Sequence, residues 1–535
     1  MRLQVTASLL ACLLSVLLFT EVRTVAAATD MKVITTPMFN KIPRTQTSKH
    51  FQMLLRVEAP ETTDLKRRFP IDLVTVVDIA GDNNLEPVKK AIKFAIRQLN
   101  NDDYLTIVAT PNSQEVLNST MLSLGGRRTA KKKVDQLKVR GGGQSSGLDE
   151  IFKMLEKQQP STEGRAKFIV LVTDATTGSL TGTIPDTFNH PPVHAFGLGS
   201  THDALPLRLI ANQTHGTYSF LDDANAGDVS VALSLCLGGI KSVAAVDARV
   251  VLKPAPGTDV KVTKIMSGSY VNSIDSGSGE IAIGALYAGE TKSFVVHLEI
   301  PPVKDPLSQD EIACSCDNQR LLIANLNYSG IDTPIQDVLI VQRPPVTVVS
   351  NLVPNSIVIN QIFYFQWLEI VENEIVVVNE VDLGNILLTK WEEFYLQRQF
   401  WIGLEIGSLA GEVTSMARRR PVAANLFSWV SSYRTQRPTA MGSPAMVVGV
   451  FLTLEVRMTL HVAIMVSRGV MVAECDYTCV KPPPNLLSRG ENGSLLYSEA
   501  YQGIFSLNDI NDLMSKIYQG LVKASDLKQC PANSD

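Results

Sequence analysis

Cysteine and charged residues are both scarce in this sequence of 535 residues. It contains seven cysteines and no C-x-x-C pair, which argues against a structural zinc site. Charged residues make up only 19% and hydrophobic residues 45%, so long disordered tails are not expected. The net charge is −4, which excludes a protein that binds nucleic acid through a strongly basic surface. The length is enough for about three domains.

Catalytic patterns are scarce as well. The seven histidines are scattered, and none forms an H-E-x-x-H pattern. No lysine follows the glycine run at residues 141–143, so this run predicts a tight turn rather than a phosphate-binding loop. Asp102 and Asp103 lie between a helix and a strand, where we expect both carboxylates to face water. We interpret His194, inside a predicted strand, as a hydrogen-bonded core residue. No catalytic residue and no organic cofactor is therefore predicted.

The first residues have the layout of a secretory signal peptide. Arg2 gives a basic start, residues 9–19 form an apolar core, and residues 25–28 supply small side chains for cleavage. This core is too short for a transmembrane span. We therefore expect a signal peptide over residues 1–28 and a secretory or extracellular location. The alternative is a cytoplasmic protein whose functional start is Met31.

Other features are consistent with secretion without deciding it. Four N-x-S/T triplets would accept glycans in a secreted protein, and they begin at Asn118, Asn212, Asn327 and Asn492. In an oxidising compartment Cys475 would form a disulfide with Cys479 or with Cys530, and the sequence leaves both pairings open.

Residues 69–82 are the stretch around which the chain is organised. A run of β-branched residues ends abruptly in Asp78 and an acidic turn, which predicts a strand buried on both faces. The next segment, 85–99, has the apolar spacing of a helix that packs by one face. Further strands are predicted at 104–109, 168–174, 193–199 and 217–220, with helices between them. This alternation predicts a doubly wound α/β domain with a mostly parallel sheet, whose ligands bind at the carboxyl ends of the strands.

The pattern changes near residue 240. Alternating segments up to residue 349 predict an antiparallel β-sandwich, and the rest is expected to be mainly helical. Residues 445–466 are the most apolar internal run, but three charged or ionisable side chains within it favour a buried helix or paired strands over a membrane span. We expect domains at 48–240, 241–349 and 350–535, with 51–57 as an edge strand leading into the α/β domain.

The α/β segments resemble the von Willebrand factor type A (VWA) domain, a Rossmann-like fold. The matching stretches are Ile71–Asp78, Phe168–Asp174, Val193–Gly199 and His202–Phe220. Segments downstream, at 267–270, 283–290 and 428–433, are similar to a plant group in which a β-sandwich and a helical region follow the VWA domain. Many members of that group act as ubiquitin ligases through an N-terminal RING zinc finger. These 535 residues contain no such finger, so ligase chemistry is not expected.

The resemblance also implies a metal-ion-dependent adhesion site. In VWA domains a D-x-S-x-S loop, a threonine and a second aspartate hold a divalent cation through hard oxygen atoms. Asp78 matches the first aspartate and Asp174 the second, whereas Ala80 and Asp82 occupy the serine positions. The threonine loop corresponds to residues 141–146, where Ser145 or Ser146 would have to replace the threonine. We therefore expect a degenerate Mg²⁺ site at Asp78, Asp82 and Asp174 that does not hold a metal.

The sequence thus predicts a non-enzymatic module that binds a protein partner through a VWA domain. One alternative is a RING-less adaptor in a ubiquitin-ligase pathway. The other is a hydrolase that uses the cleft at the carboxyl ends of the strands, which would need a nucleophile or base beside Asp78. Neither a nucleic-acid partner nor a membrane span beyond the signal-like segment is expected, and the partner protein cannot be read from the sequence.

Overall fold

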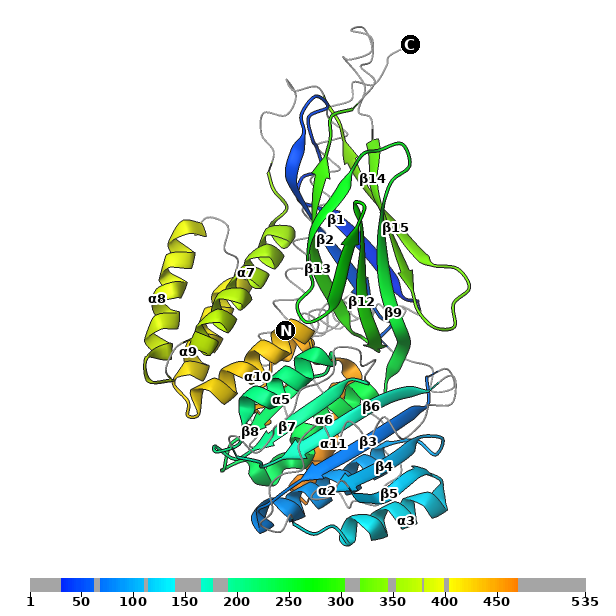
Figure 1. The fold of residues 1–535 in the computed structure, drawn as a ribbon, viewed down its shortest axis with the longest axis vertical. Coiled ribbons are helices and arrows are strands. Elements are labelled where there is room, and N and C mark those ends of the chain that lie inside the picture. Colours follow the sequence, from blue (N-terminus) through cyan, green and yellow to red (C-terminus); the bar gives the residue numbers. More distant parts are fainter. Residues whose placement is uncertain are drawn as a thin grey trace, which may run out of the picture.

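A computed structural model of the chain describes residues 30–61, 68–109, 114–139, 165–176, 191–303, 318–344, 353–377, 380–398 and 404–469. The predicted signal peptide, the glycine run at 141–143 with Ser145 and Ser146, and the cysteines after residue 469 lie outside these residues. Figure 1 shows a β-sandwich above an α/β domain, with a group of helices along one side.

Seven strands form the sheet of the α/β domain, in the order β16-β8-β7-β6-β3-β4-β5. The bounds are β3 (Ile71–Asp78), β4 (Tyr104–Ala109), β5 (Gln114–Met121), β6 (Ala166–Thr173), β7 (Val193–Leu198), β8 (Tyr218–Leu221) and β16 (Met441–Gly442). Every pair is parallel except β4 with β5. The predicted buried strand is confirmed, because β3 lies inside the sheet and only Asp72 of it is not fully buried.

Helices cover both faces of this sheet. Successive side chains of β3 point to opposite sides, so both faces carry apolar side chains that helices bury. Leu73 packs with one hydrophobic cluster and Val74 with the other. The first face is covered by α2 (Asp82–Gln98), α3 (Leu124–Asp135), α6 (Val229–Ile240) and α11 (Leu454–Ser467). The second is covered by α5 (Ala204–Gln213) and α10 (Val422–Thr435). The doubly wound fold predicted from the sequence is therefore confirmed.

Helix α6 lies between the sheet and α11, and eleven of its twelve residues are buried. This explains why its sequence is apolar on every side rather than on one stripe. Gly238 allows the two helices to approach closely, since a Cβ there would lie 2.5 Å from the Cα of Val456. The C-terminal part of the chain thus completes the α/β domain, with α11 and α10 on its faces and β16 at its edge.

Two antiparallel sheets pack face to face in the β-sandwich, as predicted. The four-stranded sheet contains β1 (Lys32–Pro37), β2 (Ser48–Glu58), β13 (Thr291–Ile300) and β10 (Lys261–Met266) in that order. The five-stranded sheet contains β11 (Val271–Asp275), β12 (Ser278–Tyr287), β9 (Val243–Pro254), β14 (Asn318–Asn327) and β15 (Ile335–Gln342).

The expected role of residues 51–57 as an edge strand of the α/β domain is wrong. They belong to β2, which lies between β1 and β13 in the β-sandwich, with Leu55 opposite Phe294. The reason is visible in the side-chain pattern, because Phe51, Met53, Leu55 and Val57 alternate inward and fill the sandwich core. Such alternation is typical of an antiparallel strand with one buried face. Residues 51–57 lie close to β3 in the sequence, and this closeness wrongly suggested that they belong to the same sheet.

The remaining α-helices of the described residues are α7 (Ser356–Val377), α8 (Glu380–Arg398) and α9 (Leu404–Ala417), which lie beside α10 at the left of Figure 1. The prediction of a mainly helical C-terminal region is confirmed for its described residues, which end at 469. The apolar run at 445–466 forms a short 3₁₀ turn, Gly449–Phe451, followed by most of α11. Among the described residues, no helix is both long and apolar enough to cross a membrane.

The expectation that Asp103 faces water is also wrong. Its carboxylate is fully buried at the amino end of the sheet and forms an ion pair of 2.7 Å with Nη2 of Arg68. It also accepts hydrogen bonds from the backbone N–H of Ile71 at 2.9 Å and of Asn100 at 2.6 Å. Asp102 differs, because 60% of its side chain is exposed. Asp103 therefore fixes the start of β3 relative to the loop before β4.

The difference in burial between Asp103 and Asp102 allows a matched test of the structural role of Asp103. Asp103→Ala removes the buried carboxylate 2.7 Å from Arg68 and leaves the guanidinium only the exposed Asp102 carboxylate at 3.6 Å, so we expect the free energy of unfolding to fall by about 3–5 kcal/mol. Asp102→Ala should change it by less than about 0.5 kcal/mol. Urea unfolding of both variants measures the difference. Equal losses for the two variants would contradict the structural role given to Asp103.

Candidate functional site

The carboxyl ends of β3 and β6 bring two of the predicted site residues together. Asp78 ends β3 and lies opposite Thr173, the last residue of β6, and Asp174 follows directly. The Asp78 side chain is fully buried and accepts a hydrogen bond of 2.8 Å from Oγ1 of Thr173. The same Oγ1 accepts a hydrogen bond of 3.0 Å from the backbone N–H of Ala175. The carboxylate of Asp78 is thus part of a structural network at the end of the sheet.

Asp174 binds the loop that follows β3. Its carboxylate accepts hydrogen bonds from the backbone N–H of Ala80 at 2.7 Å and of Gly81 at 2.9 Å. A third bond of 3.0 Å comes from the Asn84 side-chain amide. Glycine suits position 81, because a Cβ there would lie only 3.1 Å from Oδ2 of Asp174. Asp174 therefore fixes the turn between β3 and α2 and the first turn of α2.

The described residues do not fit a magnesium site. Mg²⁺ needs six oxygen atoms in near-octahedral geometry, and three directions around the Asp174 carboxylate are already taken by N–H donors. Ala80 supplies no side-chain oxygen, and the side chain of Asp82, the first residue of α2, is not among those described. Within the described residues, no group of three His, Cys, Asp or Glu side chains is arranged to hold a metal. The degenerate site at Asp78, Asp82 and Asp174 stays a prediction.

His202 completes this edge of the sheet, a role that the sequence reasoning missed. Its Nδ1 lies 2.6 Å from the carbonyl oxygen of Gly199 and its Nε2 lies 2.5 Å from the Tyr218 hydroxyl. Its ring fits only because residue 197 is glycine, since a Cβ there would lie 2.2 Å from the ring. Burial lowers the pKa of His202. In the sequence, the pattern Gly197-x-Gly199 followed by His202 could have indicated that the histidine ring packs against this strand.

Among the described residues, the outer surface of this edge is mostly polar. Figure 1 shows that it lies at the end of the α/β domain away from the β-sandwich. Ala80 and Asn83 after β3, Ser200 and Thr201 after β7, and Asp223 after β8 are exposed. Asp223 accepts hydrogen bonds from the backbone and the hydroxyl of Ser200, which holds two of these loops together. We call this surface, formed by the loops after β3, β7 and β8, the distal edge.

The opposite end of the sheet is joined to the β-sandwich by a buried ionic cluster. Arg437, which follows α10, donates a hydrogen bond of 2.7 Å from Nε to Oε1 of Glu290, in the turn between β12 and β13. Lys292 donates bonds of 3.0 Å to Glu290 and to the carbonyl oxygens of Thr435 and Gln436. Burial alone would raise the pKa of Glu290, but Arg437 and Lys292 bring it below its ordinary value. Burial lowers the pKa of Lys292 to about 7.

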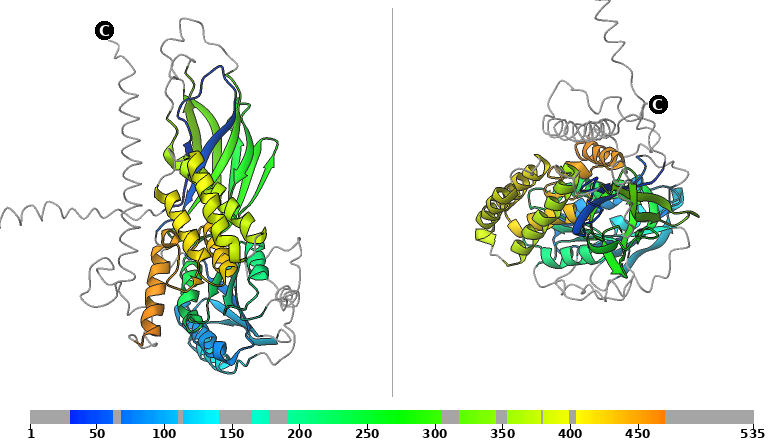
Figure 2. Two further views of the ribbon diagram at one scale, coloured as in Figure 1. Left: turned by 90° about the vertical axis from the view of Figure 1, so that its left-hand side faces the viewer. Right: turned by 90° about the horizontal axis from the view of Figure 1, so that it is seen from above.

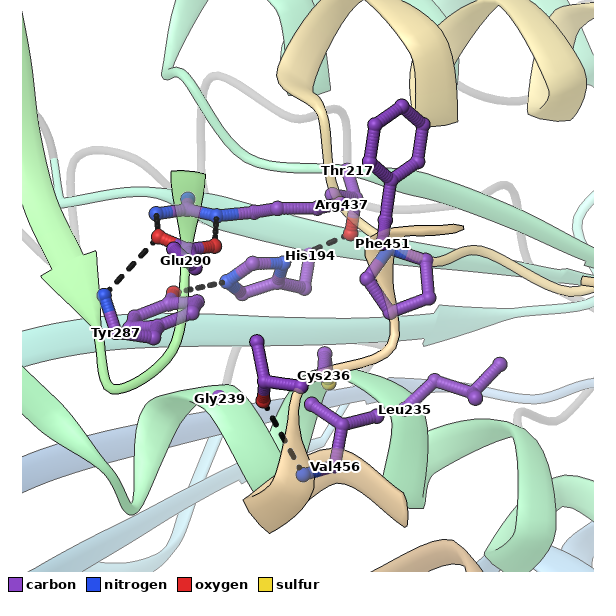
Figure 3. A pocket seen from close by; sticks show the side chains of 12 residues that line it. His194, Thr217, Leu235, Cys236, Gly239, Tyr287, Glu290, Arg437, Phe451 and Val456 are labelled. Atoms are coloured by element: carbon purple, nitrogen blue, oxygen red, sulfur yellow. Dashed lines mark hydrogen bonds and ion pairs between the residues drawn. The ribbon is translucent and has the colours of Figure 1, made fainter. Parts of the chain in front are cut away.

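His194 extends this cluster into the sheet, as Figure 3 shows. Its Nδ1 lies 2.8 Å from Oγ1 of Thr217, and its Nε2 lies 3.4 Å from the Tyr287 hydroxyl. Burial lowers the pKa of His194 to about 3, so the ring is neutral at ordinary pH. The prediction of a hydrogen-bonded core histidine is confirmed. The cavity between these groups measures about 10 Å³, room for about one water molecule, so we interpret the cluster as structural.

A serine pattern relevant to the hydrolase alternative also falls near the α/β domain. Residues 143–147, Gly-Gln-Ser-Ser-Gly, have the G-x-S-x-G spacing of a nucleophile turn, which requires a strand immediately before it. The described residues that precede this pattern belong to α3 and a turn, and residues 143–147 themselves lie outside the described part. The hydroxyl that lies beside Asp78 is that of Thr173, and both side chains are fully buried, so this pair is closed to a substrate.

Comparison with known proteins identifies the class. The family model of the von Willebrand factor type A domain matches residues 71–220, which run from the start of β3 into β8 and include the loops after β3 and β7. The chain therefore contains a VWA domain. A solved von Willebrand factor type A protein from Catenulispora acidiphila covers 77% of this chain with a TM-score of 0.57 at 13% identity, and 98% of that chain is covered. At this identity the match shows the fold.

Two known proteins are similar in sequence to part of this chain. The chain is similar to the E3 ubiquitin-protein ligase WAV3 of Arabidopsis thaliana, with 28% identity over 267 residues that cover 46% of this chain and 35% of WAV3. It is also similar to an uncharacterized protein of Synechocystis, sll0103, with 25% identity over 225 residues, 40% of this chain and 52% of that protein. The chain thus spans about a third of WAV3 and about half of sll0103. The predicted resemblance to the plant VWA group is confirmed.

The contacts of Asp174 predict how the distal edge responds to metal. A micromolar Mg²⁺ site would stabilise the protein by about 4 kcal/mol at 1 mM Mg²⁺. We expect instead that Mg²⁺ or Mn²⁺ leaves the thermal unfolding midpoint unchanged. Asp174→Ala should lower the free energy of unfolding by about 1 kcal/mol with or without metal, because loop N–H groups lose their acceptor. Metal-dependent stabilisation that Asp78→Ala abolishes would contradict this expectation.

Proposed function

We propose that this chain is a non-enzymatic protein-interaction module, whose VWA domain binds a partner protein at the distal edge without a bound metal. The observation that carries the proposal is the hydrogen bonding of Asp174, whose carboxylate binds the loop after β3 in place of a cation. Loops held in this way are preorganised, which reduces the entropic cost of binding a partner.

The position of the distal edge supports the same proposal. The amino ends of the strands face the β-sandwich and the buried ionic cluster, so they are covered by the protein itself. The carboxyl ends lie on the side of the α/β domain away from the β-sandwich (Figure 1). In α/β folds of this kind, ligands bind outside the carboxyl ends of the strands. The polar, exposed side chains of Asn83, Thr201 and Asp223 give such a partner hydrogen-bonding groups without requiring a deep pocket.

A second candidate is an adaptor in a ubiquitin-ligase pathway. The observation that favours it is the similarity to WAV3, a protein named as an E3 ubiquitin-protein ligase, over 267 residues. The match spans 35% of WAV3, so the shared part is only a portion of that ligase. In this function the same distal edge would bind the protein that is brought to the ligase.

Affinity capture with a matched pair of variants tests the proposed surface. The bait is the full chain, and the distal-edge variant is Asn83→Arg with Thr201→Arg, two exposed positions after β3 and β7. Two added arginines should block a close contact, so we expect proteins captured by the wild type to decrease at least about tenfold. Quantitative mass spectrometry with and without EDTA measures the loss, and EDTA should have no effect.

The control carries the same number of added charges on the β-sandwich. Thr263→Arg with Ser273→Arg changes two exposed residues on β10 and β11, far from the distal edge, and should capture partners at the wild-type level. Equal capture by both double variants would contradict binding at the distal edge. Loss of capture in EDTA would contradict binding without metal. Ubiquitin-ligase subunits among the specifically lost proteins would favour the adaptor.

A further inference from the structure

Strand β5 is a free edge of the α/β sheet. Among the described residues it pairs only with β4, and no strand lies on its other side. A free edge can pair with another chain, and proteins usually prevent this with lysine, proline, a bulge or a cover. The sequence of β5, Gln-Glu-Val-Leu-Asn-Ser-Thr-Met, has one charged residue and neither lysine nor proline. Next to it are two exposed apolar side chains, since Met121 is 44% exposed and Leu124, at the start of α3, is 71% exposed.

A bulge in β5 turns two polar side chains outward. The register with β4 shifts here, so that Asn118 and Ser119 together lie opposite Thr106. A bulge bends its strand and changes the direction of its side chains, and both Asn118 and Ser119 are exposed. The Thr120 hydroxyl donates a hydrogen bond of 2.6 Å to the carbonyl oxygen of Asn118. Residues 118–120 are an N-x-T triplet, the acceptor sequence for an N-linked glycan.

The surroundings of this triplet are open. Figure 1 shows β5 and α3 in the part of the α/β domain away from the β-sandwich. Figure 2, left, shows the same part from the side, drawn in blue and cyan at the bottom of the molecule and below the green β-sandwich. A large group attached to the bulge would therefore point away from the joint between the two domains.

The other triplets are less accessible. Asn212 has one end of its side-chain amide buried, and the buried Thr214 hydroxyl is hydrogen-bonded to the backbone as both donor and acceptor. Asn327 is half-buried, and its amide nitrogen lies 3.5 Å from a backbone carbonyl oxygen of the same strand. The triplet at residues 492–494 lies outside the described part of the chain. Of the three described triplets, only that of Asn118 has an exposed asparagine.

We propose that Asn118 carries an N-linked glycan, which covers the free edge of β5 and the apolar side chains of Met121 and Leu124. Met121 is three residues along the strand from Asn118, a distance of about 10 Å. A glycan is bulky and solubilising, so it would keep a second chain from pairing with β5. The compartment is the secretory pathway that the layout of residues 1–28 predicts. The modification does not depend on the function proposed for the distal edge.

The modification is a group transfer from a lipid-linked oligosaccharide diphosphate. The Nδ2 atom of Asn118 forms a bond to the anomeric carbon of the first sugar, and the bond between that carbon and the diphosphate oxygen breaks. The lipid diphosphate leaves with the electron pair and takes up the proton that Nδ2 loses. No atom is oxidised or reduced. Because the glycan is attached as the chain enters the secretory pathway, the fold must leave room for it, and the exposed bulge does so.

Cell-free translation of the full chain in the presence of endoplasmic-reticulum microsomes tests the site. Chains that enter the microsomes are protected from added protease. Treatment with peptide-N-glycosidase in heavy-oxygen water then leaves a labelled aspartate wherever a glycan was attached. We expect the protected chain to lose mass on this treatment and to carry the label at position 118. Chains that stay outside the microsomes, or protected chains without a label at position 118, would overturn the proposal.

Matched variants make the test specific. Asn118→Gln and Thr120→Ala should both abolish the glycan at position 118, whereas Thr120→Ser should keep it because a hydroxyl is retained. Asn212→Gln is the control and should leave the label at position 118 unchanged.

The covering role is tested by light scattering of the purified full chain. Asn118→Gln, which lacks the glycan, should aggregate at a lower protein concentration than the wild type. Adding Met121→Glu with Leu124→Glu to this variant should raise that concentration again, because the two charges replace the cover. Equal aggregation of the wild type and Asn118→Gln would contradict the covering role.

Discussion

The buried ion pair between Arg437 and Glu290 is the interaction on which the arrangement of this molecule depends. Glu290 belongs to the β-sandwich, Arg437 to the C-terminal region, and the adjacent Tyr287 reaches His194 in the α/β sheet. Gln436 strengthens the joint, because its side-chain amide exchanges two hydrogen bonds of 2.8 Å with the backbone of Ser293. A buried charge without its partner is costly. The three parts are therefore held in one orientation by buried hydrogen-bonded groups, and a shift of one part against another within the folded protein would break these bonds.

This joint determines which end of the α/β domain is available. It covers the amino ends of the strands, where His194 begins to contact the β-sandwich, and leaves the carboxyl ends of β3 and β6 at the opposite end of the domain (Figure 1). At that end Asp174 uses its oxygen atoms to hold the loop after β3. The two ends thus have different roles: one fixes the architecture, and the other presents ordered loops to the outside. The function proposed for the distal edge follows from this division.

Much of the fold could be predicted because its signals are local. Each run such as Ile71–Asp78 is apolar and β-branched, and a strand buried on both faces needs no information from elsewhere in the chain. The pairing of Asp78 with the end of β6 was implied by the resemblance to VWA domains. The predictions that were wrong concern contacts between residues that are far apart in the sequence. Leu55 and Phe294 pair in one sandwich although a whole domain separates them in the sequence. The buried Asp103 depends on Arg68 and on backbone N–H groups, and the two-residue strand β16 has too few residues for any pattern.

Hydrogen exchange during urea unfolding tests the central claim most directly. If the Arg437–Glu290 pair joins the three parts, the amides of β3, β13 and α10 should lose protection at one common urea concentration in the wild-type protein. Arg437→Ala should then separate these transitions, with α10 and β13 exchanging at lower urea than β3. Separate transitions already present in the wild type, or a common transition that persists in Arg437→Ala, would contradict the account.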